Sequence, residues 1–310
     1  MIAHCSLDIL RREGYKPTRS REHTPKGEER LTMATARFRS LVALVFMGFA
    51  FTAVLPAQEQ STNNGDNFTE QQMEEFLLNA KVIHSTHTAK GITEPYRLTL
   101  SDGTVTHDAS FQVVDETKQI MRFADGHTEF NFKDSYKYDI AGYELAKLLG
   151  LDNMVPVTVE RDWKGQRGAM SWWINDVVMD EGDRLRKKTS PPDPSSWNDQ
   201  MFKVRVFDEL VYDTDPNLTN VLITKDWKIW RVDFSRAFRP QKKLRNPKNL
   251  VRCDKNLFEK LKALNQDEVK AATKGVLTSG EIKGVMARRD EIVATFNKLI
   301  AKEGEGAVLY

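Results

Sequence analysis

The chain has 310 residues, of which 40% are hydrophobic and 29% are charged, and its formal net charge at pH 7 is +2. These values are typical of a globular protein with one large domain or two lobes, and they exclude a disordered or fibrous chain. Basic residues outnumber acidic ones only before position 58. The remainder is close to neutral, which gives no argument for nucleic acid as a partner.

Residues 1–57 read as an N-terminal extension followed by an export signal. A polar stretch precedes Met33, an alternative start, and then come the basic residues Arg37 and Arg39 and the apolar run Leu41–Leu55. This order predicts a secretory signal peptide that is cleaved after Ala57. The run is short for a membrane span, so we expect a periplasmic or secreted protein that contacts the membrane only through its leader. An uncleaved anchor is the alternative.

The chain has two cysteines, Cys5 and Cys253. Cys5 would leave with the signal peptide, so no disulfide is expected in the mature protein even though an exported protein could form one. Cys253 has no evident activating base in the sequence. We therefore predict a structural role for it.

Residues 58–180 change from a linker to a mainly β pattern. Residues 58–90 predict a polar linker and one amphipathic helix, which Thr69 and Gln72 begin as a capping box. The turn Ser101–Thr104 joins two expected strands. The whole region predicts strands at 96–100, 105–114, 130–132, 155–160 and 169–174 and one helix at 134–150.

Residues 181–310 are expected to be mainly helical. The apolar spacing predicts a core-facing helix over 198–212. The last helix is predicted to begin at Thr278, with Glu281 completing a capping box. Its Arg288-Arg289 pair is expected on a solvated face.

One hairpin stands out in this second half. The short apolar strands Val221–Thr224 and Ile229–Val232 are separated by a polar turn. Asp215 and Asn220 come before the first strand, and Asp233 directly follows the second. Because a hairpin brings its two ends together, we expect these three side chains to converge. Two carboxylates and one amide make an oxygen-rich site suited to Mg²⁺ that carries phosphates.

The spacing of these residues resembles that of protein kinases. Asp215 lies five positions before Asn220, as in the catalytic loop H-R-D-x-x-x-x-N, and Asp233 begins an Asp-Phe-Ser similar to Asp-Phe-Gly. Asp215-Pro-Asn in place of His-Arg-Asp resembles the atypical branch: phosphatidylinositol 4-kinases, HipA-type toxin kinases and secreted Golgi casein kinases. The alternative is a hairpin with ordinary turn residues, since Asp, Asn and Pro all favour turns.

A second stretch resembles the helix that carries the ion-pairing Glu in atypical kinases. Residues 138–151, followed by Met154-Val155-Pro156, are similar to that helix, and Asp139 falls where the Glu belongs. Gln112 stands where the third-strand Lys is expected, and its amide supplies no positive charge to phosphates. Lys133 is predicted to reach into the site instead. The alternatives are a surface lysine and a solvated carboxylate.

The resemblance implies an α+β, two-lobed fold. A small β-rich N-lobe would span residues 91–180 and a mainly helical C-lobe residues 181–310. The turn Ser101–Thr104 would then cover the phosphates, and the segment after Ser171 would form the hinge between the lobes. The whole is similar to exported bacterial proteins on an atypical-kinase scaffold.

The same resemblance implies ATP, Mg²⁺ or Mn²⁺, and transfer of a phosphoryl group to a hydroxyl acceptor. Asp215 would position the acceptor, and Asn220 and Asp233 would hold the metal. The expected nucleotide-binding positions are Lys133, Asp139 and Gln112. The acceptor is open at this point: a protein, a lipid head group or a small molecule.

A non-catalytic, pseudokinase-like binding module of the cell envelope is the competing hypothesis. Gln112 favours it, as does export, because the bacterial periplasm is poor in ATP. The presence of all three residues of the hairpin favours the enzyme, since a pure scaffold has no physical need for them. A third hypothesis is transfer of AMP in place of phosphate.

Overall fold

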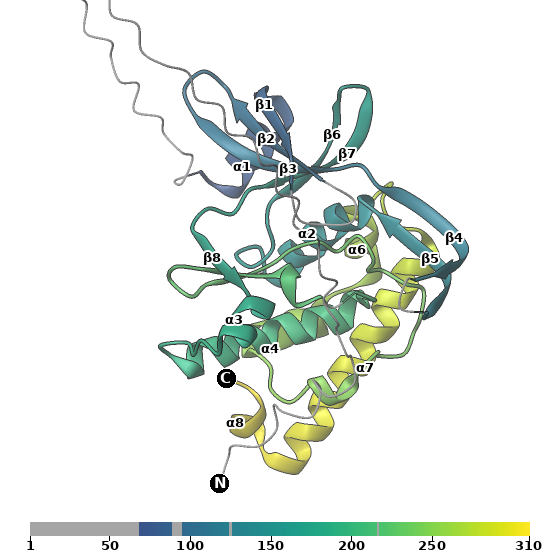
Figure 1. Cartoon of the computed structure of the whole chain (residues 1–310). Coiled ribbons are helices and arrows are strands. Elements are labelled where there is room, and N and C mark those ends of the chain that lie inside the picture. The colour runs from purple at the N-terminus through teal and green to yellow at the C-terminus, as the bar shows by residue number, and fades with distance from the viewer. Residues whose placement is uncertain (1–67, 89–94, 124–125, 216) are drawn as a thin grey trace, which may run out of the picture. The chain divides into compact units, whose positions relative to one another are not determined.

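An antiparallel sheet and a set of packed helices make up most of the protein in the computed structural model, which describes residues 68–88, 95–123, 126–215 and 217–310 (Figure 1). The predicted signal peptide, with Arg37, Arg39 and its cleavage point at Ala57, lies outside the described residues. The elements in chain order are α1 (Glu70–Asn79), β1 (Lys81–His87), β2 (Tyr96–Ser101), β3 (Thr106–Gln112), β4 (Asp115–Arg122), β5 (Thr128–Ser135), α2 (Lys137–Leu149), β6 (Thr158–Trp163), β7 (Gln166–Trp172), β8 (Val177–Asp180), α3 (Glu181–Lys187), α4 (Pro194–Val211), β9 (Val221–Thr224), β10 (Ile229–Arg231), α5 (Lys255–Ala263), α6 (Gln266–Ala272), α7 (Ser279–Glu303) and α8 (Glu305–Val308).

The largest sheet has five strands in the order β1-β2-β3-β7-β6, and every neighbouring pair is antiparallel. Alternate residues of β2 and β3 are buried, among them Leu98, Leu100 and Phe111, as expected for a sheet with one covered face. Helices α1 and α2 pack against β6 and β7. The sheet and these helices form the β-rich part of the fold.

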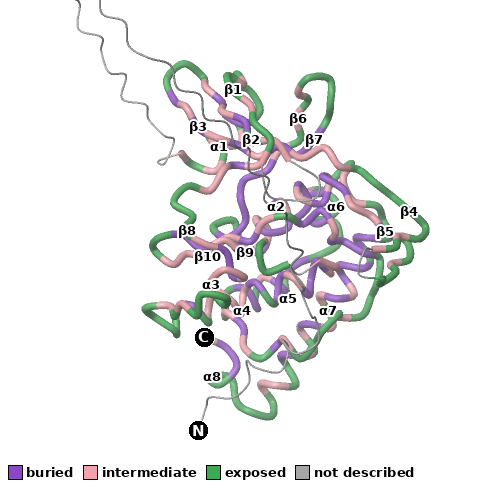
Figure 2. The backbone as a smooth tube through the Cα atoms, in the orientation of Figure 1, coloured by how far each residue is buried: buried purple, intermediate pink, exposed green. Residues whose placement is uncertain are grey.

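Two smaller sheets carry the elements nearest the candidate site. Strands β8, β9 and β10 form one of them, in the order β10-β9-β8, and they confirm the predicted hairpin, with β10 ending at Arg231. Strands β4 and β5 form a hairpin between β3 and α2. Every residue of β4 except Met121 is exposed (Figure 2).

The helices begin where capping chemistry allows. Thr69 and Gln72 form the predicted capping box of α1, and Thr278 and Glu281 form that of α7. Asp193 caps α4, whose first residue is Pro194. Buried stretches run along α2, α4 and α7 (Figure 2), and one continuous hydrophobic cluster joins these helices to the large sheet. The α+β fold with a β-rich and a helical part is therefore confirmed.

The strand count of the large sheet differs from the prediction. Strand β1 was not expected, because it is mostly exposed and lacks a regular apolar alternation. The first hairpin is therefore β1–β2, whose connection includes residues 89–94, outside the described part. The turn Ser101–Thr104 lies between β2 and β3 instead. There the Asp102 carboxylate accepts the N–H groups of Thr104 and Val105, both at 2.8 Å, as in an ordinary Asx turn.

Helix α2 begins at Lys137, three residues later than expected. Asp134 and Ser135 belong to β5, where they pair with Glu116 and Asp115 of β4. Gly150 ends the helix with a left-handed φ of 68°. None of the described helices is both long and apolar enough to cross a lipid bilayer.

The C-terminal residues are bound to the strand-like segment around Cys253. The Cys253 N–H donates to the Val308 carbonyl at 3.0 Å, and the Tyr310 N–H donates to the Cys253 carbonyl at 3.2 Å. Cys253 and Val308 are fully buried. Burial raises the pKa of the Cys253 thiol to about 12, which fits its predicted structural role.

Candidate active site

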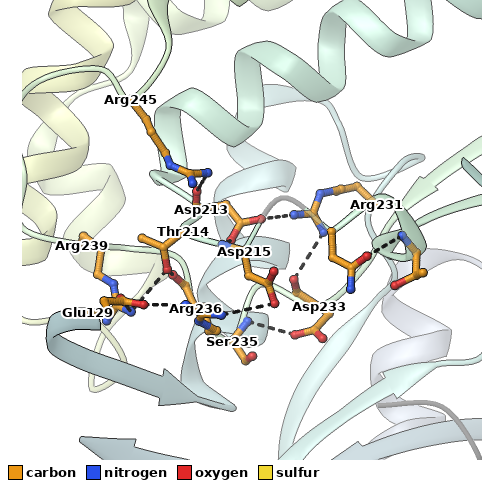
Figure 3. Close-up of polar contacts among 12 residues, drawn as sticks. Glu129, Asp213, Thr214, Asp215, Arg231, Asp233, Ser235, Arg236, Arg239 and Arg245 are labelled. Carbon is orange, nitrogen blue, oxygen red and sulfur yellow. Dashed lines mark hydrogen bonds and ion pairs between the residues drawn. The ribbon is translucent and has the colours of Figure 1, made fainter. Parts of the chain in front are cut away.

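The base of the β9–β10 hairpin gathers the three residues singled out in the sequence. Asn220 lies opposite the end of β10, because its carbonyl accepts the Val232 N–H at 3.0 Å. Asp215 is held beside the segment after β10 by Thr214, whose Oγ1 donates to the Arg236 carbonyl at 2.9 Å. The side chains of Asp215 and Asp233 point into the same space (Figure 3). The structure thus brings Asp215, Asn220 and Asp233 together.

Asp233 is exposed and has a left-handed backbone, with φ of 61°. This conformation is uncommon outside glycine and is often found at functional sites. The next residue, Phe234, donates its N–H to Asp139 Oδ1 at 2.6 Å and is buried under α2. A Cβ on Gly142 of α2 would lie only 2.6 Å from the Phe234 ring. The glycine therefore lets α2 approach the ring closely.

Arg231 joins the two chain segments of the site. Its Nε lies 3.0 Å from Asp208 Oδ1, and its Nη2 makes a close ion pair with Asp213 Oδ2. Its Nη1 donates to the carbonyls of Val232 and Asp233 (Figure 3). The side chains of Arg231 and Asp213 are only 3% and 1% exposed. Arg231 therefore ties the segment that precedes Asp215 to the backbone that carries Asp233.

The carboxylates around Asp233 are incompletely balanced by cations. Burial and the Asp233 carboxylate raise the pKa of Asp139 well above its ordinary value. Burial, aided by Asp233, also raises the pKa of Asp134, whose buried Oδ1 has no hydrogen-bond partner among the described residues. Burial raises the pKa of Asp215, and the Arg236 cation opposes that shift.

Arg236 lies on the other side of Asp215. Its Nη1 is 3.5 Å from Asp215 Oδ2, and its Nη2 is 2.5 Å from Glu129 Oε2 on β5. The other oxygen of Glu129 is 2.6 Å from Arg239 Nη2 (Figure 3). The Ser135 N–H donates to the Ser235 carbonyl at 2.8 Å. The β4–β5 hairpin is thus attached to the segment that follows Asp233.

Lys133, which was predicted to reach into the site, points elsewhere. Lys133 lies on β5, and its Nζ binds Glu281 of α7 at 3.0 Å and sits 4.6 Å from the centre of the Tyr138 ring. Asp139 instead receives the Phe234 N–H. Because β5 directs Lys133 toward α7, its ammonium group does not reach the residues at the hairpin base as expected. Gln112 lies at the end of β3, opposite Ala169 of β7.

The predicted hinge segment borders a separate cavity. Trp172, Trp173 and Ile174 line a cavity of about 560 Å³ together with Trp230 and Lys228. None of the three residues at the hairpin base lines it. The cavity is therefore distinct from the acidic site.

Arg288 corrects another prediction. Its side chain is fully buried, and burial lowers its pKa to about 10. It donates to the carbonyl of Leu210, at 2.8 Å, and to that of Arg239, at 2.9 Å. Leu210 precedes Asp215 in the sequence, and Arg239 follows Asp233. Arg288 therefore anchors both of these segments to α7.

Comparisons with known proteins give a fold and no sequence family. No family model matches the chain, and neither does any curated protein sequence. The structure of Fam20 from hydra, solved with sugar, superposes with a TM-score of 0.58 at 13% identity, covering 77% of this chain and 91% of that one. The Golgi casein kinase superposes with a TM-score of 0.54 at 11% identity, covering 78% and 79%. The same kinase with Mn/ADP bound gives 0.53 at 10% identity, covering 77% and 78%.

The fold is that of an atypical kinase. This confirms the resemblance that the hairpin and the α2 region indicated. At these identities the likeness concerns the fold alone, so the roles of single residues rest on the geometry of the site.

Three arginines near the base of the hairpin were not predicted from the sequence. Arg231, Arg236 and Arg239 all lie within seven positions of Asp233, and Asp213 lies two before Asp215. Charged residues so close to an expected metal ligand were the available signal. Glu129 offered none, because it is more than 100 positions away from its two partners.

Proposed function

We propose that the protein is an ATP- and metal-dependent phosphotransferase that acts on a hydroxyl acceptor. The observation that carries the proposal is the meeting of Asp215, Asn220 and Asp233 at the base of one hairpin, on an atypical-kinase fold. A Golgi casein kinase of this fold has been solved with Mn/ADP, which supports a nucleotide and a divalent metal as cofactors. The acceptor is a protein, a lipid head group or a small molecule outside the cytoplasm.

The donor set fits a divalent ion that arrives with its nucleotide. Asp233 and Asn220 would hold it, through a carboxylate and an amide oxygen. Within the described ranges, no three His, Cys, Asp or Glu side chains are close enough to bind a metal alone. Mg²⁺ commonly takes only one or two carboxylates and fills its shell with phosphate oxygens and water. Burial and the Asp233 carboxylate raise the pKa values of Asp134 and Asp139, and a bound cation would oppose both shifts by favouring the charged carboxylates.

The residues of the site would have separate roles in the phosphoryl transfer. The bound metal would neutralise charge on the phosphates. Asp215, 44% exposed, would accept the proton of the acceptor hydroxyl on its carboxylate. Its raised pKa brings it nearer to the working pH, as suits a general base. Arg231 would hold Asp213 and the backbone of Asp233 in place. The distance between the base, Asp215, and the metal ligand, Asp233, would then stay fixed.

The second candidate is a pseudokinase-like binding module. Gln112 favours it, and so does the binding of Lys133 to Glu281, because both remove a cation expected near the phosphates. The two candidates differ in one measurable property. A binding module would take up nucleotide without any transfer that depends on Asp215.

Binding and transfer measured on the same protein test the proposal. We expect Asp233→Asn to abolish the dependence of ATP affinity on Mg²⁺ or Mn²⁺ in a calorimetric titration. Asp215→Asn should leave that affinity intact and lower single-turnover transfer from labelled ATP by on the order of 10²–10⁴-fold, the usual contribution of a positioned base. The acceptors would be the components of a cell-envelope extract.

Asp226→Asn is the matched control. This aspartate lies in the turn at the other end of the same hairpin, where it accepts a hydrogen bond from Thr224. The substitution should change neither metal dependence nor transfer. Wild-type turnover in Asp215→Asn would remove Asp215 from the reaction. Nucleotide binding by the wild type without transfer to any component would favour the binding module.

A further inference from the structure

The guanidinium of Arg236 is the cation that meets Asp215. Arg236 lies three residues after Asp233, and its Nη1 is 3.5 Å from Asp215 Oδ2. Its side chain is 15% exposed, so the charge is partly shielded from water. A charge in such a place interacts more strongly with a phosphoryl group than a charge in bulk solvent does.

The surroundings of Arg236 fix its orientation and leave part of it unused. The rings of Phe123 and Phe132 lie 5.0 and 5.3 Å from its guanidinium carbon, and Glu129 holds Nη2. Its Nε is buried and has no hydrogen-bond partner in the part of the chain that the structure describes. Arginine has five N–H donors and no acceptor. An orphaned donor beside a held guanidinium indicates a site that expects a further anion.

Two other cations near the site, Arg231 and Lys133, are already paired with carboxylates. Arg231 is buried between Asp208 and Asp213, and Lys133 is bound to Glu281. Gln112 carries no charge. A phosphoryl group in transfer spreads negative charge over its equatorial oxygens, and catalysis depends on cations placed in advance to meet it.

We propose that Arg236 contacts the transferred phosphoryl group and supplies the positive charge that Gln112 cannot. The inference rests on the proposed phosphotransfer. In that step the bond from the acceptor oxygen to phosphorus forms, the bond from phosphorus to the ADP oxygen breaks, and the acceptor proton goes to Asp215. Arg236 exchanges no proton. Glu129, which also binds Arg239, fixes one end of its guanidinium, and Nη1 stays on the side of Asp215, where the phosphoryl group would arrive.

The test compares two affinities of the full chain: that for Mg²⁺·ADP alone, and that for Mg²⁺·ADP with aluminium fluoride, which mimics the phosphoryl group in transfer. Transition-state analogues bind roughly 10²–10⁸-fold more tightly than substrates, so the wild type should bind more tightly with the fluoride. In Arg236→Gln this tightening should fall by on the order of 10²–10³-fold, the loss expected for one preorganised donor. The affinity for Mg²⁺·ADP alone should stay unchanged.

Arg184→Gln is the matched control, since Arg184 on α3 is 14% exposed, pairs with the Glu181 carboxylate and lies over the Trp197 ring, much as Arg236 lies between Glu129 and two rings. It should retain the tightening. Arg236→Lys, which keeps a charge and tests a variant with less risk to the fold, should retain part of it. If the wild type shows no tightening, the proposed phosphotransfer fails and the role of Arg236 with it. If the wild type tightens and Arg236→Gln tightens equally, or Arg184→Gln loses as much, the role of Arg236 alone is refuted.

Discussion

Replacing Arg231 by methionine should strongly destabilise the protein. The guanidinium contacts two carboxylates and two backbone carbonyls, and its side chain is 3% exposed. Methionine fills a similar space but leaves Asp213, 1% exposed, without its cation. Removing one partner of a buried ion pair costs about 3–5 kcal/mol, because the remaining charge is left unpaired.

That cost converts into a large shift of the melting temperature. For a folded domain of 150–250 residues, losing 1 kcal/mol of unfolding free energy lowers Tm by roughly 2–4 °C. We therefore expect Tm to fall by roughly 6–20 °C. Calorimetry and urea unfolding followed by tryptophan fluorescence would measure the change. Because Arg231 also holds the Asp233 carbonyl, metal-dependent ATP binding should weaken in the variant even well below its melting temperature.

An exposed pair in the same chain provides the control. Arg167 and Asp162 form an ion pair in which both side chains are more than 60% exposed. Arg167→Met should cost less than about 1 kcal/mol, as is usual for surface pairs. If Arg231→Met proves no more costly than Arg167→Met, the reasoning that Asp213 is a buried charge in need of Arg231 is wrong.

Two further predictions concern the same site. The acidic limb of the pH profile of kcat/KM should lie above about pH 3.9, the ordinary pKa of Asp, because burial raises the pKa of Asp215 and the base must be ionised. Arg236→Gln should move this limb to higher pH, since the cation it removes lowers that pKa; an unmoved limb would contradict the contact. Gly142→Ala should destabilise by about 1–3 kcal/mol in urea unfolding, because its Cβ would meet the Phe234 ring at 2.6 Å. Gly280→Ala, a helical position where the added Cβ would lie 3.9 Å from Thr278 Oγ1, should cause no such loss. Equal losses in the two variants would show that the Phe234 ring simply moves aside.

Local patterns sufficed for the hairpin and for the starts of α1 and α7, but not for those of α2 and α4, which begin at Lys137 and Pro194. The alternation of Val221–Thr224 and Ile229–Arg231 around a polar turn is a short-range signal, and so are the capping boxes at Thr69 and Thr278. The convergence of Asp215 and Asp233 followed from the hairpin, because its geometry brings its own ends together.

Partners distant in sequence were beyond the reach of these patterns. Lys133 meets Glu281 across 148 positions, and nothing near either residue indicates the other. Arg288 was expected in solvent because arginine is rarely buried. It is buried because carbonyls from two separate segments receive its donors, one of them that of Leu210. Strand β4 escaped prediction for the opposite reason, since nearly all of it is exposed.

The pairing of Cys253 with the C-terminal residues provides an intrinsic probe of local opening. Cys253 is the single cysteine of residues 58–310, and a protein made from these residues alone carries one thiol. The Cys253 side chain is fully buried, and its backbone is bonded to Val308 and Tyr310. A thiol reagent therefore reacts only when the structure around Cys253 opens, and its rate measures how often this happens. The dependence of that rate on nucleotide and metal would show whether binding at the hairpin changes the opening of the C-terminal pairing, without any introduced label.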